Sequence, residues 1–245
     1  RLRERAEHQG RGAPRPIGAL RDTFANPHAR TIYAMVWILH MGGGASSVLS
    51  PYIMDDVIGA REHTATVYIV HMVSQFASIP VWTRLAKAAG KKATWLTAMG
   101  VGMVGYAMIL FVGEGDLVWM CTASGFTGSL HAAGIVIGYS VLADVVDWDE
   151  LRTGERKEAS YFAVYHFLYK AAGGVMAMLA GYGIQWAGYA GAPDVLEQTP
   201  LVKRTMTTML GGIPLACIGV GALLFSRFRL TSEEHARIRG ELEAR

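Results

Sequence analysis

Six long apolar stretches constrain this chain more than any other feature of its sequence. They cover residues 31–50, 64–83, 93–113, 117–142, 159–189 and 205–226. A helix needs about 20 mostly apolar residues to cross the hydrocarbon of a bilayer. A helix of a soluble protein keeps one polar face, whereas these stretches are apolar on nearly every side. The sequence therefore predicts an all-α, polytopic membrane protein with six transmembrane helices.

The polar segments divide the chain into three parts. Residues 1–30 are rich in arginine, glycine and proline, and we predict a cytoplasmic linker there. Residues 31–226 form the predicted six-helix bundle. Residues 227–245 form a predicted cytoplasmic tail with a short solvated helix, which Thr231 or Ser232 can cap.

Several ends of the spans are marked by breakers. Pro51 is expected to end the first span, because proline disrupts a helix interior. The run Gly90-Lys91-Lys92 is expected to separate the second span from the third. The fifth stretch is longer than a span requires, so we expect it to tilt or to end in a short extra turn.

Lysine and arginine predict the orientation. Most of the 23 basic residues lie in residues 1–30, 84–92, 143–158 and the tail; the exceptions are Arg61, Lys203, Arg204 and Lys170. Basic connections stay on the cytoplasmic side of a membrane. We therefore expect a multi-pass protein of the cell membrane with both termini in the cytoplasm. The net charge of +3 is too small and scattered for a nucleic-acid surface, so no nucleic-acid partner is expected.

The acidic residues avoid the spans. None of the 20 Asp and Glu residues lies in the middle of an apolar stretch. Hard cations prefer oxygen ligands, usually with at least one charge. A coupling cation would therefore be bound mainly by groups outside this chain, within which we expect no metal site and no cofactor.

Lys170 is the one basic residue inside a span. It lies eleven residues after Ala159, which is about 16 Å along a helix and near the bilayer centre. An ammonium there must face a wet cavity, meet a carboxylate or lose its proton, and such residues are usually functional. The alternative is a lysine paired inside the fold for packing.

A polar and aromatic strip surrounds Lys170 in the predicted helix. His166 lies one turn earlier on the same face, with Tyr161, Tyr165 and Tyr169 around it. Such a strip suits a hydroxyl-rich or anionic ligand, although a hydrogen-bonded core histidine is an equal alternative for His166. Gln75 in the second span is a further candidate, so the predicted solute-binding residues are Lys170, His166, Tyr165, Tyr169 and Gln75. A core role is the more ordinary expectation for His40, His71 and His131, which also lie within spans.

The connection at residues 143–158 is densely charged, with six acids and three bases. Opposite charges at a membrane edge favour an ion-pair network, which can close one side of a protein and reopen at a modest free-energy change. The alternative is a solvated loop whose acids merely balance its bases.

The same connection carries a family resemblance. The run Ala143-Asp144-Val145-Val146-Asp147-Trp148-Asp149-Glu150, followed by Thr153-Gly154-Glu155-Arg156, resembles the loop between helices 10 and 11 of glycoside–pentoside–hexuronide:cation symporters. These are melibiose-carrier-like members of the major facilitator superfamily. The spacing to Lys170 is similar to that family's helix-11 lysine, and weaker similarities cover nearly the whole chain.

The resemblance implies a role for several residues. The family has twelve helices, so this chain resembles helices 7 to 12, and the family's cation site lies mainly on helices 2 and 4. It implies that Lys170 lies beside the solute and cation sites. It also implies a cytoplasmic gate that contains Asp144, Asp147, Arg152 and Arg156. Ile135 stands where sugar carriers of the melibiose type have a tryptophan, and His166 replaces a small hydroxyl residue, so the solute is expected to differ from melibiose.

Together these observations predict the C-terminal half of a cation-coupled secondary symporter that moves a sugar, glycoside or related polar or anionic solute by alternating access. Its partners would be the solute, a sodium ion or proton, the lipid bilayer and an N-terminal six-helix half. The alternatives are a lysolipid transporter of the same family and a non-transporting membrane scaffold or sensor. An enzyme is not expected, because the spans contain no constellation of catalytic residues.

Overall fold

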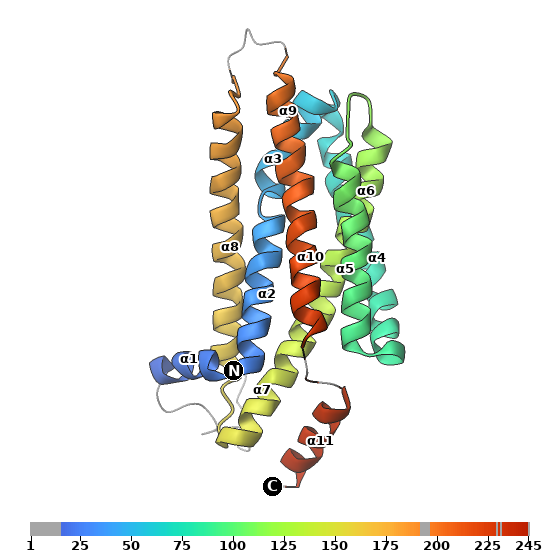
Figure 1. The fold of residues 1–245 in the computed structure, drawn as a ribbon. Coiled ribbons are helices and arrows are strands. Elements are labelled where there is room, and N and C mark those ends of the chain that lie inside the picture. The colour runs from blue at the N-terminus through green and yellow to red at the C-terminus, as the bar shows by residue number, and fades with distance from the viewer. Residues whose placement is uncertain (1–15, 192–196, 229, 231, 245) are drawn as a thin grey trace, which may run out of the picture.

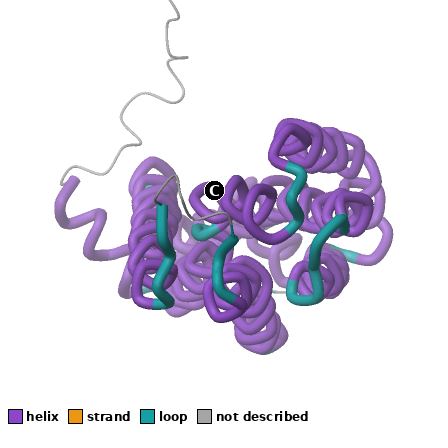
Figure 2. The backbone as a smooth tube through the Cα atoms, turned by 90° about the horizontal axis from the view of Figure 1, so that it is seen from above, coloured by secondary structure: helices purple, strands orange, loops and turns teal. Residues whose placement is uncertain are grey.

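The computed structural model describes residues 16–191, 197–228, 230 and 232–244, and these residues form helices joined by short loops, without a strand (Figure 1). The long helices stand side by side along one direction, and Figure 2 looks along it. The described elements are α1 (Pro16–Ala25), α2 (Pro27–Gly43), α3 (Ser46–Tyr52), η2 (Ile53–Val57), η3 (Arg61–His63), α4 (Thr64–Ala89), α5 (Lys91–Ile109), α6 (Leu117–Ala133), η4 (Gly134–Gly138), α7 (Tyr139–Thr153), α8 (Glu158–Trp186), α9 (Pro200–Thr207), η5 (Thr208–Gly212), α10 (Ile213–Ser226) and α11 (Ser232–Glu243).

Each predicted span corresponds to one long rod of helix, so the predicted all-α polytopic fold is confirmed. In the described part of the chain, four rods are long and apolar enough to cross a membrane: Pro27–Val57, Leu117–Thr153, Glu158–Trp186 and Pro200–Ser226. The other two rods, α4 and α5, have 26 and 19 residues. They reach the length of a span but are less apolar than the other four.

The rods pack into one bundle with a largely apolar exterior. Helix α4 packs against α6 and α5, α10 packs against α2 and α5, and α2 packs against α8. Large apolar side chains remain exposed on the bundle, among them Phe76, Phe167 and Trp186. Soluble proteins rarely expose so much apolar surface, so this surface needs lipid or another protein against it.

Pro51 does not end the first rod, contrary to expectation. The helix continues from α3 into the π-helical turn η2, where the Ile58 N–H donates to the Ile53 carbonyl at 2.9 Å. Proline removes one donor from the helical ladder, but the helix continues beyond it, with the Ile53 N–H donating to the Leu49 and Ser50 carbonyls. The rod is interrupted earlier, by a turn at Gly44 and Ala45 between α2 and α3.

The charged connection at residues 143–158 is mostly helix rather than loop. Helix α7 runs to Thr153 and ends at Gly154, which has a φ of 72°. Glycine adopts this left-handed conformation without strain, so it ends the helix cleanly. The expected loop over residues 143–153 is wrong because ion pairs, described below, satisfy the charged side chains of a continuing helix.

Both ends of the described chain are helical and packed. Residues 16–25 of the predicted linker form α1, which packs against α2 and α8, while residues 1–15 lie outside the described part. The tail forms α11, and its Ile238 is only 2% exposed. The predicted tail helix is therefore present but only partly solvated, because one side of α11 packs on α7. The capping residue Thr231 lies outside the described residues, and the division into linker, bundle and tail stays a prediction.

Helices α1 and α11 lie at the same end of the bundle (Figure 1). The connection between α4 and α5 and the connection between α7 and α8 lie there too. This end therefore carries the basic connections found in the sequence, and we call it the basic end. Its assignment to the cytoplasm stays a prediction.

Candidate functional site

Helix α8 presents the predicted solute-binding strip along one side. It is a continuous helix of 29 residues, Glu158–Trp186. Lys170 and His166 are both exposed, as their spacing of four residues predicts. Tyr169 is 44% exposed, whereas Tyr165 is only 5% exposed and faces the core. The strip therefore has an exposed cation and imidazole above a buried aromatic layer.

Aromatic rings from other helices border this strip. The ring centroids of His166 and Tyr139 are 5.6 Å apart, and those of Tyr139 and Tyr165 are 5.4 Å apart. On the other side, the Tyr169 ring meets His40 of α2 edge-on at 4.1 Å. The α8 strip is thus bordered by rings from α2 and α7.

Gln75 lies apart from the α8 strip in this structure. It is half-buried on α4, which packs against α6 and α5, whereas α8 packs against α2. Among the described residues, no hydrogen bond joins Gln75 to α8. Its predicted part in the site therefore stays a prediction that contacts within this bundle do not support.

Three of the four predicted gate residues, Asp144, Asp147 and Arg156, form a network at the basic end, whereas Arg152 lies outside it. The Lys91 ammonium lies 2.6 Å from both carboxylate oxygens of Asp144. His235 of α11 bridges two carboxylates, at 3.3 Å from Asp144 and 3.0 Å from Asp147. Asp147 also pairs with Arg156 at 3.3 Å. These contacts join α5, α7 and α11, so the ion-pair interpretation of this segment is favoured over the solvated loop.

Two arginines of the predicted gate have different partners. Arg156 pairs with Glu150 of α7 at 2.7 Å and with Glu158 of α8 at 2.9 Å, so it spans the junction between the helices. The guanidinium of Arg152 lies 4.6 Å from the centroid of the Trp148 ring, a cation–π contact. We call Lys91, Asp144, Asp147, Glu150, Arg156, Glu158 and His235 the charge network.

A second cluster lies beside this network; it joins residues of the charged segment 143–158 to Asp22, which the sequence did not single out. The Lys157 ammonium lies 3.1 Å from Asp22 of α1, 3.4 Å from Glu155 and 4.0 Å from Asp149. Burial alone lowers the pKa of Lys157, but the hydrogen bond to Asp22 and the charge of Asp149 outweigh burial and raise it. Lys157 therefore stays charged, and its ion pair with Asp22 links α1 to the start of α8.

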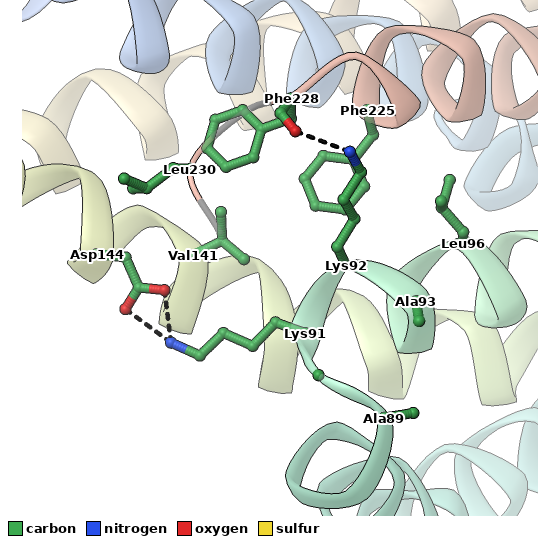
Figure 3. A pocket seen from close by; sticks show the side chains of 11 residues that line it. Ala89, Lys91, Lys92, Ala93, Leu96, Val141, Asp144, Phe225, Phe228 and Leu230 are labelled. Atoms are coloured by element: carbon green, nitrogen blue, oxygen red, sulfur yellow. Dashed lines mark hydrogen bonds and ion pairs between the residues drawn. The ribbon is translucent and has the colours of Figure 1, made fainter. Parts of the chain in front are cut away.

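A cavity of about 390 Å³ opens at the basic end beside the charge network (Figure 3). Lys91 and Asp144 lie on one side of it, and the Lys92 ammonium donates to the Phe228 carbonyl at 2.8 Å on the other. The remaining wall is mostly apolar and includes Phe225. The Lys91–Asp144 pair therefore lies at the wall of this cavity, with side chains 31% and 12% exposed.

The sequence missed Lys91, His235 and Asp22 as members of these clusters, whereas Lys157 is one of the three bases counted in residues 143–158. Each lies far along the chain from at least one of its partners; Lys91 and Asp144 are separated by 53 residues and His235 and Asp147 by 88. The one local signal was the dense charge of residues 143–158. Among the described residues, no group of three or more His, Cys, Asp and Glu side chains could hold a metal ion.

The family and the relatives that match this chain are described as transport proteins or symporters. The model of the family described as MFS/sugar transport protein matches residues 1–232. The sodium-dependent lysophosphatidylcholine symporter 1-A of Danio rerio is 28% identical over 181 residues, which is 72% of this chain and 33% of that relative. An uncharacterized symporter of Bacillus subtilis, YjmB, is 25% identical over 195 residues, 78% of this chain and 41% of that relative.

A further relative has a different solute in its name. The lactose permease of Lactobacillus helveticus is 26% identical over 195 residues, which is 79% of this chain and 30% of that relative. The chain spans roughly a third of the length of these curated relatives. All three relatives are named as membrane transporters, and their names differ between lipid and sugar.

Proposed function

The chain belongs to the MFS/sugar transport protein family, and from that premise we propose that it forms the C-terminal six-helix bundle of a cation-coupled symporter. One observation carries the proposal: Lys170 is exposed halfway along a membrane-spanning helix and has no ion-pair partner among the described residues. A charged group at that depth needs water, a solute or an acidic partner. A solute cavity between this bundle and an N-terminal bundle supplies all three.

The proposed solute has an anionic or hydroxyl-rich group. Lys170 binds the anionic group, or pairs with an acid of the N-terminal bundle, and the imidazole of His166 and the Tyr169 hydroxyl offer hydrogen bonds beside it. Sugars, glycosides and uronides fit this chemistry, and the lactose permease relative supports it.

A lysolipid is the second candidate, because apolar side chains continue along the same helix. Phe167 is 69% exposed, Met178 54% and Tyr182 51%. These side chains could contact an acyl chain while Lys170 binds a phosphate. The relatives named as lysophosphatidylcholine symporters support this candidate.

The charge network is the proposed cytoplasmic gate. Its ion pairs join the ends of α5, α7 and α8 with α11 at the basic end, beside the cavity. Alternating access requires contacts that close one side and reopen at a modest free-energy change. Partly exposed ion pairs have this property, because water replaces part of the lost attraction.

The test is uptake by the full transporter in proteoliposomes, with labelled sugars, uronides and lysolipids offered separately under a sodium or a proton gradient. Lys170→Ala should abolish coupled uptake, whereas the matched Lys203→Ala change, in an exposed ion pair with Glu197 at the opposite end, should preserve it. Intact cation-dependent uptake by Lys170→Ala would overturn the assignment. Absence of uptake in the unaltered protein under every gradient would favour the scaffold or sensor alternative.

A further inference from the structure

Helices α4 and α6 bring two histidines into direct contact inside the membrane. Nδ1 of His131 lies 3.0 Å from Nε2 of His71, and both side chains are half-buried. Residues 64–83 and 117–133, which surround the pair on its own helices, contain no Asp, Glu, Lys or Arg. The imidazoles are therefore the strongest bases on this part of the bundle.

A close crossing of the two helices holds the rings at this distance. Gly128 lies one turn before His131 on α6, and a Cβ added to it would collide with the backbone carbonyl of His71. Small residues let membrane helices approach so closely. The contact between the imidazoles is therefore fixed by the backbones and does not depend on a side-chain rotamer alone.

The hydrogen bonds assign a proton to each ring. The Thr127 hydroxyl donates to the Ser124 carbonyl at 3.2 Å, so its oxygen accepts from Nδ1 of His71 at 3.4 Å. Because His71 then carries its proton on Nδ1, its Nε2 accepts from the Nδ1–H of His131. Nε2 of His131 is left with a lone pair, and it has no hydrogen-bond donor among the described residues.

From this chain of donors we infer that the His71–His131 pair is a proton-binding site, with the proton taken up at Nε2 of His131. A ring lone pair forms the new N–H bond, and the hydronium ion that delivered the proton leaves as water. The imidazolium then donates its Nδ1–H to neutral His71 in a charge-assisted hydrogen bond, which is stronger than the neutral one. Ser124 ends the chain as a carbonyl acceptor.

The site is linked to the proposed solute-binding strip through one intermediate ring. His40 of α2 lies close enough to His131 to interact with it electrostatically. The His40 ring also meets Tyr169, the neighbour of Lys170 on α8. Helix α5 packs against α4 and α6, the two helices that carry the histidine pair. The titratable side chain in the apolar part of α5, Tyr106, is hydrogen-bonded to Ser46.

A positive charge on His131 would raise the potential at the α8 strip and strengthen binding of an anionic solute there. Proton and solute would then bind cooperatively, which is the thermodynamic requirement for symport. This part of the inference rests on the proposed function. Proton binding at the pair does not, and the two are tested separately.

The proton site is tested by solid-state NMR of the full transporter in lipid bilayers, with ¹⁵N in its histidine rings. As the pH is lowered from about 8, we expect one ring to gain a second N–H while it stays coupled to another ring across an N–H···N hydrogen bond. His131→Gln should remove the titration. His71→Leu should remove the coupling, and His71→Gln, whose side-chain oxygen accepts at the same place, should keep the titration. His63→Gln, at the opposite end of α4, is the control and should change neither signal.

The inference is overturned if the titrating signal survives in His131→Gln, or if both rings keep a single N–H down to the lowest pH. The coupling is tested by uptake driven by an inward proton gradient, which should fall roughly tenfold or more in His131→Gln. Exchange of solute without a gradient should continue in that variant. Unchanged gradient-driven uptake would refute the coupling, whereas failure of all uptake in the unaltered protein would refute the transporter assignment and leave the NMR result to decide the proton site.

Discussion

Lys157→Met tests whether an ion pair at the basic end stabilises the fold because it is buried or only because its charges lie close together. The Lys157 side chain is only 4% exposed and has three carboxylates within 4.0 Å. The side chains of Asp22 and Glu155 are 54% and 45% exposed, so water can hydrate them once the lysine is gone. Asp149 is 9% exposed and its Oδ2 already has no hydrogen-bond partner in the described part of the chain, so it would be left buried without a countercharge, with its hydrogen bond to Tyr161 alone.

The magnitude follows from that one stranded carboxylate. Removing one partner of a buried pair costs about 3–5 kcal/mol, because the other charge is left uncompensated. Since Asp22 and Glu155 can be hydrated, we take the lower end, about 3 kcal/mol. In a protein of this size, each kcal/mol changes the melting temperature by about 2–4 °C, so Lys157→Met should lower it by about 6–12 °C.

The matched control has the same chemistry without the burial. Lys203 pairs with Glu197 at 2.9 Å, and the two side chains are 26% and 78% exposed. Exposed pairs contribute about 0–1 kcal/mol, so Lys203→Met should change the melting temperature by no more than about 4 °C. Adding Asp149→Asn to Lys157→Met should recover much of the loss, because a neutral amide replaces the stranded charge.

The assay is thermal unfolding of the purified protein in detergent, followed by tryptophan fluorescence. Ion pairs raise the pKa of Lys157, so its stabilisation is full below the unfolded value of about 10.4 and is lost as the pH rises through the higher folded value. The difference between Lys157→Met and the unaltered protein should therefore be constant across neutral pH. The reasoning fails if Lys157→Met loses no more stability than Lys203→Met, or if Asp149→Asn restores nothing.

Three further changes have expected outcomes. A Cβ at Gly44 would lie 2.7 Å from the Gly173 carbonyl oxygen, so Gly44→Ala should force α8 outward and cost about 1–3 kcal/mol in thermal unfolding; Gly100→Ala, which meets open space, should be neutral or slightly stabilising. Asn26→Ala removes a cap from two amides of α2 and a buried hydrogen bond to the Tyr161 hydroxyl, and should lower the unfolding free energy by about 1–3 kcal/mol. His235→Gln loosens α11 from α7, and loss of about 1 kcal/mol should speed tryptic cleavage between α10 and α11 about fivefold. An unchanged cleavage rate would show that Ile238 alone holds the helix.

The length and composition of the apolar stretches predicted the rods but not their ends. A span is encoded locally, since about 20 apolar residues in sequence suffice. The ends depend on distant partners: α7 extends over its charged residues because Lys91 and His235 pair with its acids. The first rod likewise continues through Pro51 into a π turn, where a local rule ends the helix.

The candidate sites show the same division between local and distant information. Lys170 and His166 share a face because helical spacing alone determines it. The contact between His71 and His131 joins residues 60 positions apart, and only the crossing of α4 and α6 brings them together. No pattern within either helix distinguishes these histidines from core histidines such as the sequence suggested.

The distribution of ionisable groups relates the proposed sites to one another. The described carboxylates lie at the ends of the bundle, whereas its membrane-spanning interior has Lys170 and several imidazoles. Hard cations prefer oxygen ligands, usually with charge, so under the proposed function a sodium ion would be bound mainly outside this bundle. An N-terminal bundle with acidic residues would then hold a metal cation, and this bundle would sense it through Lys170. Coupling by protons instead would require no acid at all, because His131 and His71 already provide an acceptor and its hydrogen-bond partner.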